Sequence, residues 1–208
     1  MASLRLEAIG HLFMKPVDLE IDAGELVFLS GPSGSGKSLL LRAVADLDPH
    51  QGEAWLGSES RSGLSPPVWR RRVGLLPAES FWWAERVGEH LPGGDAETAK
   101  SKERLSDWLA QLGFDLDVLD WEVARLSTGE RQRLALIRLL TQNPEALLLD
   151  EATANLDPAN RDQVERLIHD YRRSATAAVL WVSHDPAQRQ RLATRAYVIQ
   201  DGALVSEP

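Results

Sequence analysis

A glycine-rich loop that ends in a lysine and a serine carries the clearest chemistry in the chain. Residues 31–38 read GPSGSGKS, the full pattern G-x-x-x-x-G-K-[ST]. An apolar, β-prone run (25–29) precedes it and a helix-like run (39–45) follows, which is the strand–loop–helix setting that the pattern needs. Glycines let the backbone turn its N–H groups inward, and a helix N-terminus favours an anion. The loop predicts a nucleoside triphosphate site; the alternative is a glycine-rich turn with a chance lysine.

Two loop side chains have specific expected roles. Lys37 reaches the β- and γ-phosphates, and the hydroxyl of Ser38 ligates Mg²⁺. The residues expected to bind the nucleotide are Gly31, Pro32, Ser33, Gly34, Ser35, Gly36, Lys37, Ser38 and Leu39.

A second cluster follows an apolar run. Residues 146–149 read ALLL and lead into Asp150 and Glu151. Ligands of parallel sheets gather at the carboxyl ends of strands, so both acids are expected to face the nucleotide. Asp150 then holds Mg²⁺ and Glu151 polarises the attacking water as a general base. The alternative is a strand that simply ends in solvated acids.

A helix start is predicted at residues 126–130, LSTGE. Ser127 and Glu130 have the spacing of a capping box, with Ser127 as the N-cap. The same geometry leaves free N–H groups at a positive helix end, where an anion can bind.

Composition narrows the class of protein. The chain has 208 residues, 43% hydrophobic and 26% charged, which suits one soluble domain with a real core. Its net charge of -8 argues against a main role in binding nucleic acid. The lack of cysteine excludes disulfides and cysteine nucleophiles. No apolar run approaches a membrane span and no basic-then-apolar leader is present, so we expect a cytoplasmic protein.

Alternating strand and helix patterns after the loop predict a parallel, doubly wound α/β sheet. Strands are expected at 4–9, 17–21, 51–57, 73–76, 146–149 and 177–182, helices at 96–112, 130–141, 158–173 and 186–192, and a closing hairpin at 196–205. The composition changes at 78–125, where glycine, proline and charged residues precede the amphipathic stretch. This part is therefore expected to be a helical insertion.

With these motifs in place, the chain resembles the ATP-binding cassette (ABC) family over essentially its full length. GPSGSGKS resembles Walker A, LSTGE the signature loop and LLLDE Walker B. Residues 154–157 resemble the D-loop, and His184 in WVSHD resembles the switch histidine. Residues 167–171 and 178–185 are similar to the ATPase subunits of small bacterial putative metal (iron) export systems.

The resemblance implies a P-loop NTPase core with a mostly parallel sheet, an antiparallel N-terminal sheet and a small helical subdomain. It implies one ABC domain over 1–208, divided into a catalytic core (1–77 and 126–208) and a helical subdomain (78–125).

It also implies a homodimer of ATPase subunits packed head to tail. Ser127 and Gly129 of one chain then touch the γ-phosphate held by Lys37 of the other. Asp157 crosses the interface, and His184 contacts the same phosphate. A separate transmembrane permease is the expected partner, and it holds the subunit at the inner face of the cell membrane.

Some positions depart from the family pattern. Ala78 stands where the family carries a glutamine that completes the Mg²⁺ shell, so either Glu79 substitutes or water takes that place. Thr128 replaces a glycine, and Glu130 a glutamine, in the signature loop. His11 aligns with the adenine-stacking tyrosine, and Phe13 is close by; either ring offers a π-face.

Two further runs have open interpretations. Residues 81–83, FWW, either pack inside the helical insertion or anchor a coupling helix of a membrane subunit. Residues 70–72, RRR, are expected to form a solvated face, with a role near lipid or phosphate as the alternative.

The predicted function is that of an ATP-hydrolysing subunit that drives a permease with ATP and Mg²⁺. A soluble ABC ATPase without a membrane partner is one alternative. A nucleotide-binding regulatory module with weak hydrolysis is another, suggested by Ala78 alone.

Overall fold

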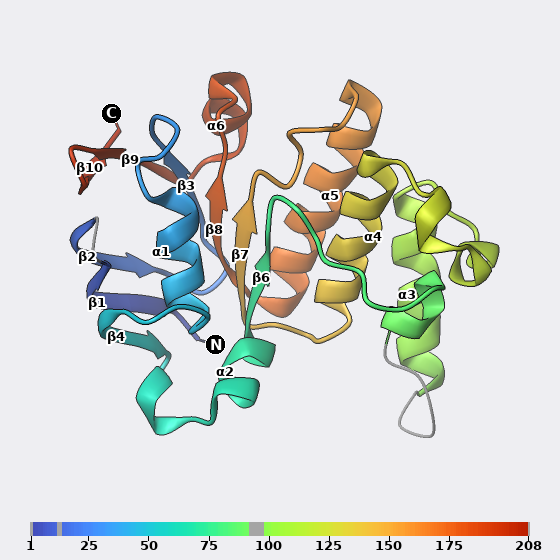
Figure 1. Ribbon diagram of the computed structural model, residues 1–208, viewed down its shortest axis with the longest axis horizontal. Helices are drawn as coiled ribbons and strands as arrows, with labels where there is room; N and C mark the ends of the chain where they lie inside the picture. Colours follow the sequence, from blue (N-terminus) through green and yellow to red (C-terminus); the bar gives the residue numbers. More distant parts are fainter. Residues whose placement is uncertain (1, 12–13, 92–97, 208) are drawn as a thin grey trace.

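Two sheets with helices between and around them make up the computed structural model (Figure 1), which describes residues 2–11, 14–91 and 98–207. The larger sheet has six strands in the order β10-β9-β3-β8-β7-β6, and neighbours are parallel except for the antiparallel pair β9–β10. The smaller sheet is antiparallel, in the order β2-β1-β4-β5. The predicted α/β class, with a mostly parallel sheet and an antiparallel N-terminal sheet, is confirmed.

The predicted strands are all present. The strands are β1 (Leu4–His11), β2 (Met14–Ile21), β3 (Leu26–Ser30), β4 (Gln51–Leu56), β5 (Glu59–Ser60), β6 (Val73–Leu76), β7 (Ala146–Asp150), β8 (Ala178–Val182), β9 (Arg195–Gln200) and β10 (Ala203–Ser206). The α-helices are α1 (Lys37–Val44), α2 (Pro66–Arg72), α3 (Ala99–Gln111), α4 (Thr128–Leu140), α5 (Pro158–Ala175) and α6 (Pro186–Leu192). Of these helices, α2 was not predicted.

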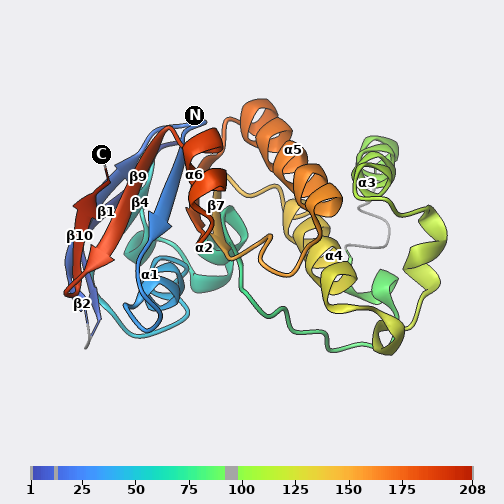
Figure 2. The ribbon, with the colours of Figure 1, turned by 90° about the horizontal axis from the view of Figure 1, so that it is seen from above.

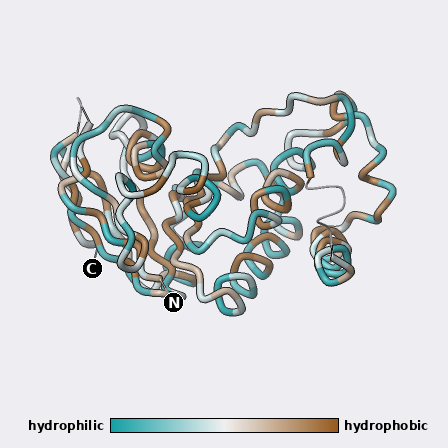
Figure 3. Tube along the Cα trace, turned by 90° about the horizontal axis from the view of Figure 1, so that it is seen from below, coloured by the Kyte–Doolittle hydropathy of each residue, from teal (hydrophilic) through white to brown (hydrophobic). Residues whose placement is uncertain are grey.

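The central strands read as unbroken apolar runs because the sheet is buried on both faces. In β8, Val179 and Trp181 face a core shared with α3, α4 and α5, whereas Leu180 and Val182 face a second core with α1 and the small sheet. The strands β3 and β7 alternate in the same way. Hydrophobic residues accordingly colour the middle of the trace in Figure 3. Each central strand therefore joins two cores.

The small sheet and α1 lie on one side of the larger sheet, and α4, α5 and then α3 lie on the other (Figure 2). Residues 78–125 hold α3 and short 3₁₀ helices at Val87–His90, Leu116–Asp120 and Val123–Arg125. Side chains of α3 such as Leu105 and Leu109 pack into the core that contains α4 and α5. The division of the chain into two catalytic parts and a helical subdomain stays a prediction.

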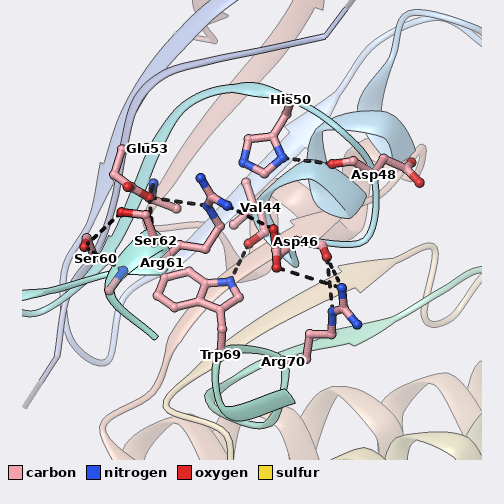
Figure 4. A network of polar contacts seen from close by, with 12 residues as sticks. Val44, Asp46, Asp48, His50, Glu53, Ser60, Arg61, Ser62, Trp69 and Arg70 are labelled. Atoms are coloured by element: carbon pink, nitrogen blue, oxygen red, sulfur yellow. Dashed lines mark hydrogen bonds and ion pairs between the residues drawn. The ribbon is translucent and has the colours of Figure 1, made fainter. Parts of the chain in front are cut away.

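The arginines of α2 match the expected solvated face only in part. Arg72 pairs with Glu145, at 2.6 Å, and with Glu59, also at 2.6 Å. Arg70 donates to the carbonyl of Asp46, which follows α1 (Figure 4). Arg70 and Arg71 are both exposed, whereas Arg72 is partly buried. Two of the three arginines therefore fasten α2 to other elements.

The run 81–83 also differs from the interpretation of buried packing. Phe81 is 75% exposed and Trp83 is 63% exposed, while Trp82 packs partly against the core. Arg138 lies over both indole rings, with its Cζ 4.7 Å from the Trp82 ring centroid and 5.0 Å from that of Trp83. The result is an exposed aromatic pair, Phe81 and Trp83. In the described part of the chain, no helix is long and apolar enough to cross a membrane.

Candidate nucleotide site

Three neighbouring strands bring the predicted site residues together. The strands β3, β8 and β7 are adjacent and parallel, so their carboxyl ends meet at one edge of the sheet. The glycine-rich loop follows β3 and His184 follows β8. Asp150 is the last residue of β7, and Glu151 comes directly after it. Ligands of parallel sheets bind at this edge.

The loop backbone needs glycine where it turns most tightly. Gly31 has φ +140°, and a Cβ there would lie 2.8 Å from the carbonyl oxygen of Ile199. Gly36 has φ +99°, and a Cβ there would lie 2.7 Å from the Sδ of Met14. Met14 thus packs against the start of α1, a contact that sequence reasoning missed. The loop can keep this shape only with glycine at both positions.

Two polar side chains of the phosphate loop, Lys37 and Ser35, are suited to bind a polyphosphate. Lys37 Nζ donates to the carbonyl oxygens of Gly31 and Pro32, both at 2.9 Å. The hydroxyl of Ser35 is buried and has no hydrogen-bond partner among the described residues. A buried orphan hydroxyl and a lysine held only by carbonyls are groups that a polyphosphate can satisfy.

The acid after β7 is held in an uncommon backbone conformation. Glu151 has φ 51°, in the left-handed region that a non-glycine residue rarely adopts, and its N–H donates to the carbonyl of Val182. Its Oε1 lies 3.3 Å from Nε2 of His184. The turn therefore brings Glu151 and His184 together at the sheet edge.

These two side chains are shared by two cavities. One, of about 250 Å³, is lined by Glu151 and His184 together with Ser33, Gly34, Gly36, Lys37, Ser38 and Leu39. The other, of about 290 Å³, is lined by Glu151 and His184 together with Thr153, Ala154, Arg161, Ser183 and Asp185. The loop, the acid and the histidine thus border two cavities that share Glu151 and His184.

Burial shifts the pKa values of Lys37 and Asp150 in opposite directions. Burial lowers the pKa of Lys37, and the nearby carboxylates of Glu151 and Asp150 partly restore it. Burial also raises the pKa of Asp150, which is 7% exposed, while a hydrogen bond from Ser38 opposes that shift. A cation beside Asp150 would remove most of this cost. The hydroxyl of Ser38 and the carboxylate of Asp150 are hard oxygen donors that fit Mg²⁺.

Ser127 caps α4 as predicted. Its hydroxyl accepts from the N–H of Glu130, and the Glu130 carboxylate accepts from the N–H and hydroxyl of Ser127 at 2.8 and 2.7 Å. Asp157 likewise caps α5, accepting from the N–H of Asn160. Neither Ser127, Gly129 nor Asp157 is among the residues that line the two cavities. Within one chain, these three residues are not brought to the phosphate loop.

Two predictions about the rim of the site stay predictions: the aromatic ring that stacks on adenine, and the residue that replaces the family glutamine. His11 ends β1, but its side chain and all of Phe13 lie outside the described residues. Ala78 follows β6, and the exposed Glu79 lines neither cavity. The proposed replacement of the family glutamine by Glu79 has no contact here to support it.

Comparison with protein families decides the class of the chain. The family model described as ABC transporter matches residues 14–154, from β2 through β7. The chain belongs to the ABC transporter family. That match contains the phosphate loop, the capped α4 and both acids at the end of β7.

Individual ABC relatives agree with this assignment. The chain is 35% identical over 190 residues to the "probable iron export ATP-binding protein FetA" of Escherichia coli, covering 88% of this chain and 84% of that protein. It is 35% identical over 200 residues to the "thiamine import ATP-binding protein ThiQ" of Photorhabdus laumondii, covering 93% and 83%. The chain is therefore an ATP-binding and ATP-hydrolysing subunit of the ABC transporter class.

The ABC fold is also found in a solved structure. A bacterial Atm1-family ABC exporter with ATP bound superimposes with a TM-score of 0.82 over 98% of this chain and 38% of that one, at 23% identity. At that identity the likeness concerns the fold.

Proposed function

We propose that two copies of the chain pack head to tail around two Mg-ATP molecules and drive a separate membrane permease. The observation that carries this proposal is the position of Ser127 and Gly129. They form a helix N-terminus suited to an anion, yet they do not border the cavity that Lys37 lines in the same chain. A second chain can bring its own capped helix to that phosphate.

Residue roles in this proposal follow from the geometry of the cavity. Glu151 accepts the proton of the attacking water, and His184 orients its carboxylate from 3.3 Å. Lys37 leaves the carbonyls of Gly31 and Pro32 to bind phosphate oxygens. Ser38 and Asp150 hold Mg²⁺, which supplies positive charge to the triphosphate. Asp157 and Ser127 act from the other chain.

The exposed aromatic pair, Phe81 and Trp83, supports the proposal of a permease partner. Phe81 and Trp83 follow β6 by a few residues and stand out at the surface of a chain whose other large apolar side chains are mostly buried. Exposed aromatic residues of this kind mark protein interfaces. We propose that this pair binds the permease and so holds the subunit at the inner face of the membrane. The relatives carry different cargoes in their names, so no cargo is assigned.

The first test replaces the proposed base. Glu151→Gln keeps the shape of the side chain but cannot accept a proton, so ATP hydrolysis should fall by at least about a hundredfold. ATP binding should persist, and the variant should accumulate as an ATP-bound dimer in light scattering.

The matched control is Glu145→Gln, because Glu145 lies before β7 at the opposite end of the strand. It should hydrolyse ATP at the normal rate. Undiminished turnover by Glu151→Gln would remove Glu151 from the role of base. A variant that binds ATP but stays monomeric would overturn the head-to-tail dimer.

A further inference from the structure

A buried amide on α6 joins the segment after β7 to the segment after β8. Gln188 has 0% exposure. Its Nε2 donates to Thr153 Oγ1 at 2.9 Å and to Glu165 Oε1 at 2.9 Å. Its Oε1 accepts from the hydroxyl of Ser183 at 2.6 Å. One side chain thus contacts three elements far apart in the sequence.

The orientation of this amide is fixed by its neighbours. Glu165 is a carboxylate that also accepts from Arg191, at 2.6 and 2.8 Å, so only the NH₂ end of Gln188 can face it. The hydroxyl of Ser183 donates to Gln188 and accepts from the N–H of Asp185 at 3.1 Å. Every polar atom of the amide has a partner, which makes the loss of any one costly in a buried site.

Both loops at this junction carry a proposed active residue. Ser183 directly precedes His184, and Asp185 is also held by a bond from the Gln188 N–H at 3.2 Å. Thr153 is 6% exposed and lies two residues after Glu151, in the turn that leads to Asp157. The amide therefore lies behind the pair whose side chains meet at 3.3 Å.

We propose that Gln188 is a positioning residue that locks the His184 segment to the 151–157 segment and so sets the geometry of the Glu151–His184 pair. This inference rests on the proposed roles of Glu151 and His184. It does not depend on the dimer partner or the permease. Misplacing reacting groups by about 1 Å costs on the order of a hundredfold in rate, so a junction of this kind has a measurable effect on hydrolysis.

The chain offers a matched pair of glutamines for the test. Gln190 lies on the same short helix and is exposed. Gln188→Met should lower kcat by about tenfold or more without changing the dissociation constant of ATP, because the phosphate loop is untouched. Gln190→Met should leave both unchanged. Equal kcat values for the two variants would overturn the proposal.

A conservative variant gives a pH signature. Gln188→Glu places a second carboxyl beside Glu165, and the two cannot both ionise easily. At low pH the introduced carboxyl keeps its proton and can still donate to Glu165, so kcat should be near normal. Turnover should then fall as the pH rises, relative to the unchanged protein. Other charged groups lie around the site: Arg161 and Asp162 of α5, Arg189 and Arg191 of α6, Asp185, and Glu207, which pairs with Arg189. A constant ratio of the two rates across pH would contradict the assignment.

Hydrogen exchange provides a readout that is independent of turnover. In Gln188→Met, amides of 151–157 and 183–185 should exchange faster together, while those of 31–38 should not. If that variant does not fold, Thr153→Val and Ser183→Ala each remove one arm of the junction with little change in volume. Each should accelerate exchange in both segments. Acceleration confined to the mutated segment would show that the amide does not connect them. Failure of Glu151→Gln to form a dimer, by contrast, would leave this result unaffected.

Discussion

At the scale of single residues, the carboxylate of Glu130 competes with the γ-phosphate for the hydroxyl of Ser127, which is proposed to bind that phosphate. It accepts from both the N–H and the hydroxyl of Ser127, and those hydrogen bonds lower its pKa, so it stays ionised. An ionised side chain at this helix end repels the incoming γ-phosphate and holds the Ser127 hydroxyl.

Glu130→Gln should therefore strengthen ATP-driven dimerisation by a few fold, because an amide still completes the capping box without the charge. The concentration of ATP needed for half-maximal dimer, measured by light scattering in the Glu151→Gln background, checks this. Glu122→Gln, outside α4, is the control and should have no effect. Weaker dimerisation by Glu130→Gln would mean that the carboxylate itself contributes to the interface.

The buried acid Asp150 gives a prediction about pH and stability. Burial raises its pKa above the usual 3.8, so the folded chain binds this proton more tightly than the unfolded chain does. The contribution of Asp150 to stability is greatest below pH 3.8 and is lost as the pH rises through the raised pKa. At neutral pH the nucleotide-free protein bears the cost of a buried carboxylate.

Asp150→Asn should then raise the Tm of the nucleotide-free protein at pH 7 and change it less near pH 4. The same variant should lose the extra stabilisation that Mg-ATP gives over ATP alone. Thermal melts at both pH values, with Asp162→Asn of the exposed α5 face as control, make the comparison. A lower Tm for Asp150→Asn at pH 7 would show that attraction to Lys37 outweighs desolvation.

Sequence reasoning located some of these residues and not others for a physical reason. Lys37, Asp150, Glu151 and His184 follow strands whose apolar runs are visible, and the order of parallel strands brings their ends together. Gln188 has no such signal, because α6 is too short for its buried and exposed glutamines to be told apart by period.

At the scale of elements, α2 stabilises the end of α1. The indole N–H of Trp69, which is fully buried, donates to the carbonyl of Val44 at 2.9 Å (Figure 4). Val44 ends α1, where carbonyls lack partners inside the helix. The phosphate loop begins the same helix, so α2 secures the site from behind.

Trp69→Phe keeps an aromatic ring but leaves that carbonyl without its donor. We expect the free energy of unfolding to fall by about 1–3 kcal/mol, measured by urea denaturation. Trp83→Phe, at an exposed position, should change it by less than about 0.5 kcal/mol. Equal effects of the two substitutions would argue that the Trp69 hydrogen bond adds nothing.

The central strands β3, β7 and β8 were predicted because burial on both faces leaves apolar runs, whereas α2 was not predicted. Its sequence, PPVWRRR, begins with two prolines and lacks an apolar period. The contacts that hold it include ion pairs of Arg72 with Glu59 and Glu145, which are 13 and 73 residues from Arg72. Pairing over such separations cannot be read from local sequence.

At the scale of the whole molecule, substitutions of the exposed aromatic pair test binding of a permease separately from ATP hydrolysis. Replacing Phe81 and Trp83 together with serine should abolish co-purification with the proposed permease and leave the basal ATPase rate within about twofold, because neither side chain lines the cavities. Leu116→Ser, another exposed apolar residue, should have no effect on either. Retained co-purification by the double variant would place the docking surface elsewhere.

The alternation of side chains along the central strands has a spectroscopic consequence. Trp181 is fully enclosed in the core with α3, α4 and α5, and Trp69 in the core with α1 and the small sheet. Each half of the protein thus contains its own native reporter. Fluorine resonances from these two indoles, after incorporation of fluorotryptophan, can follow the halves separately as nucleotide is titrated.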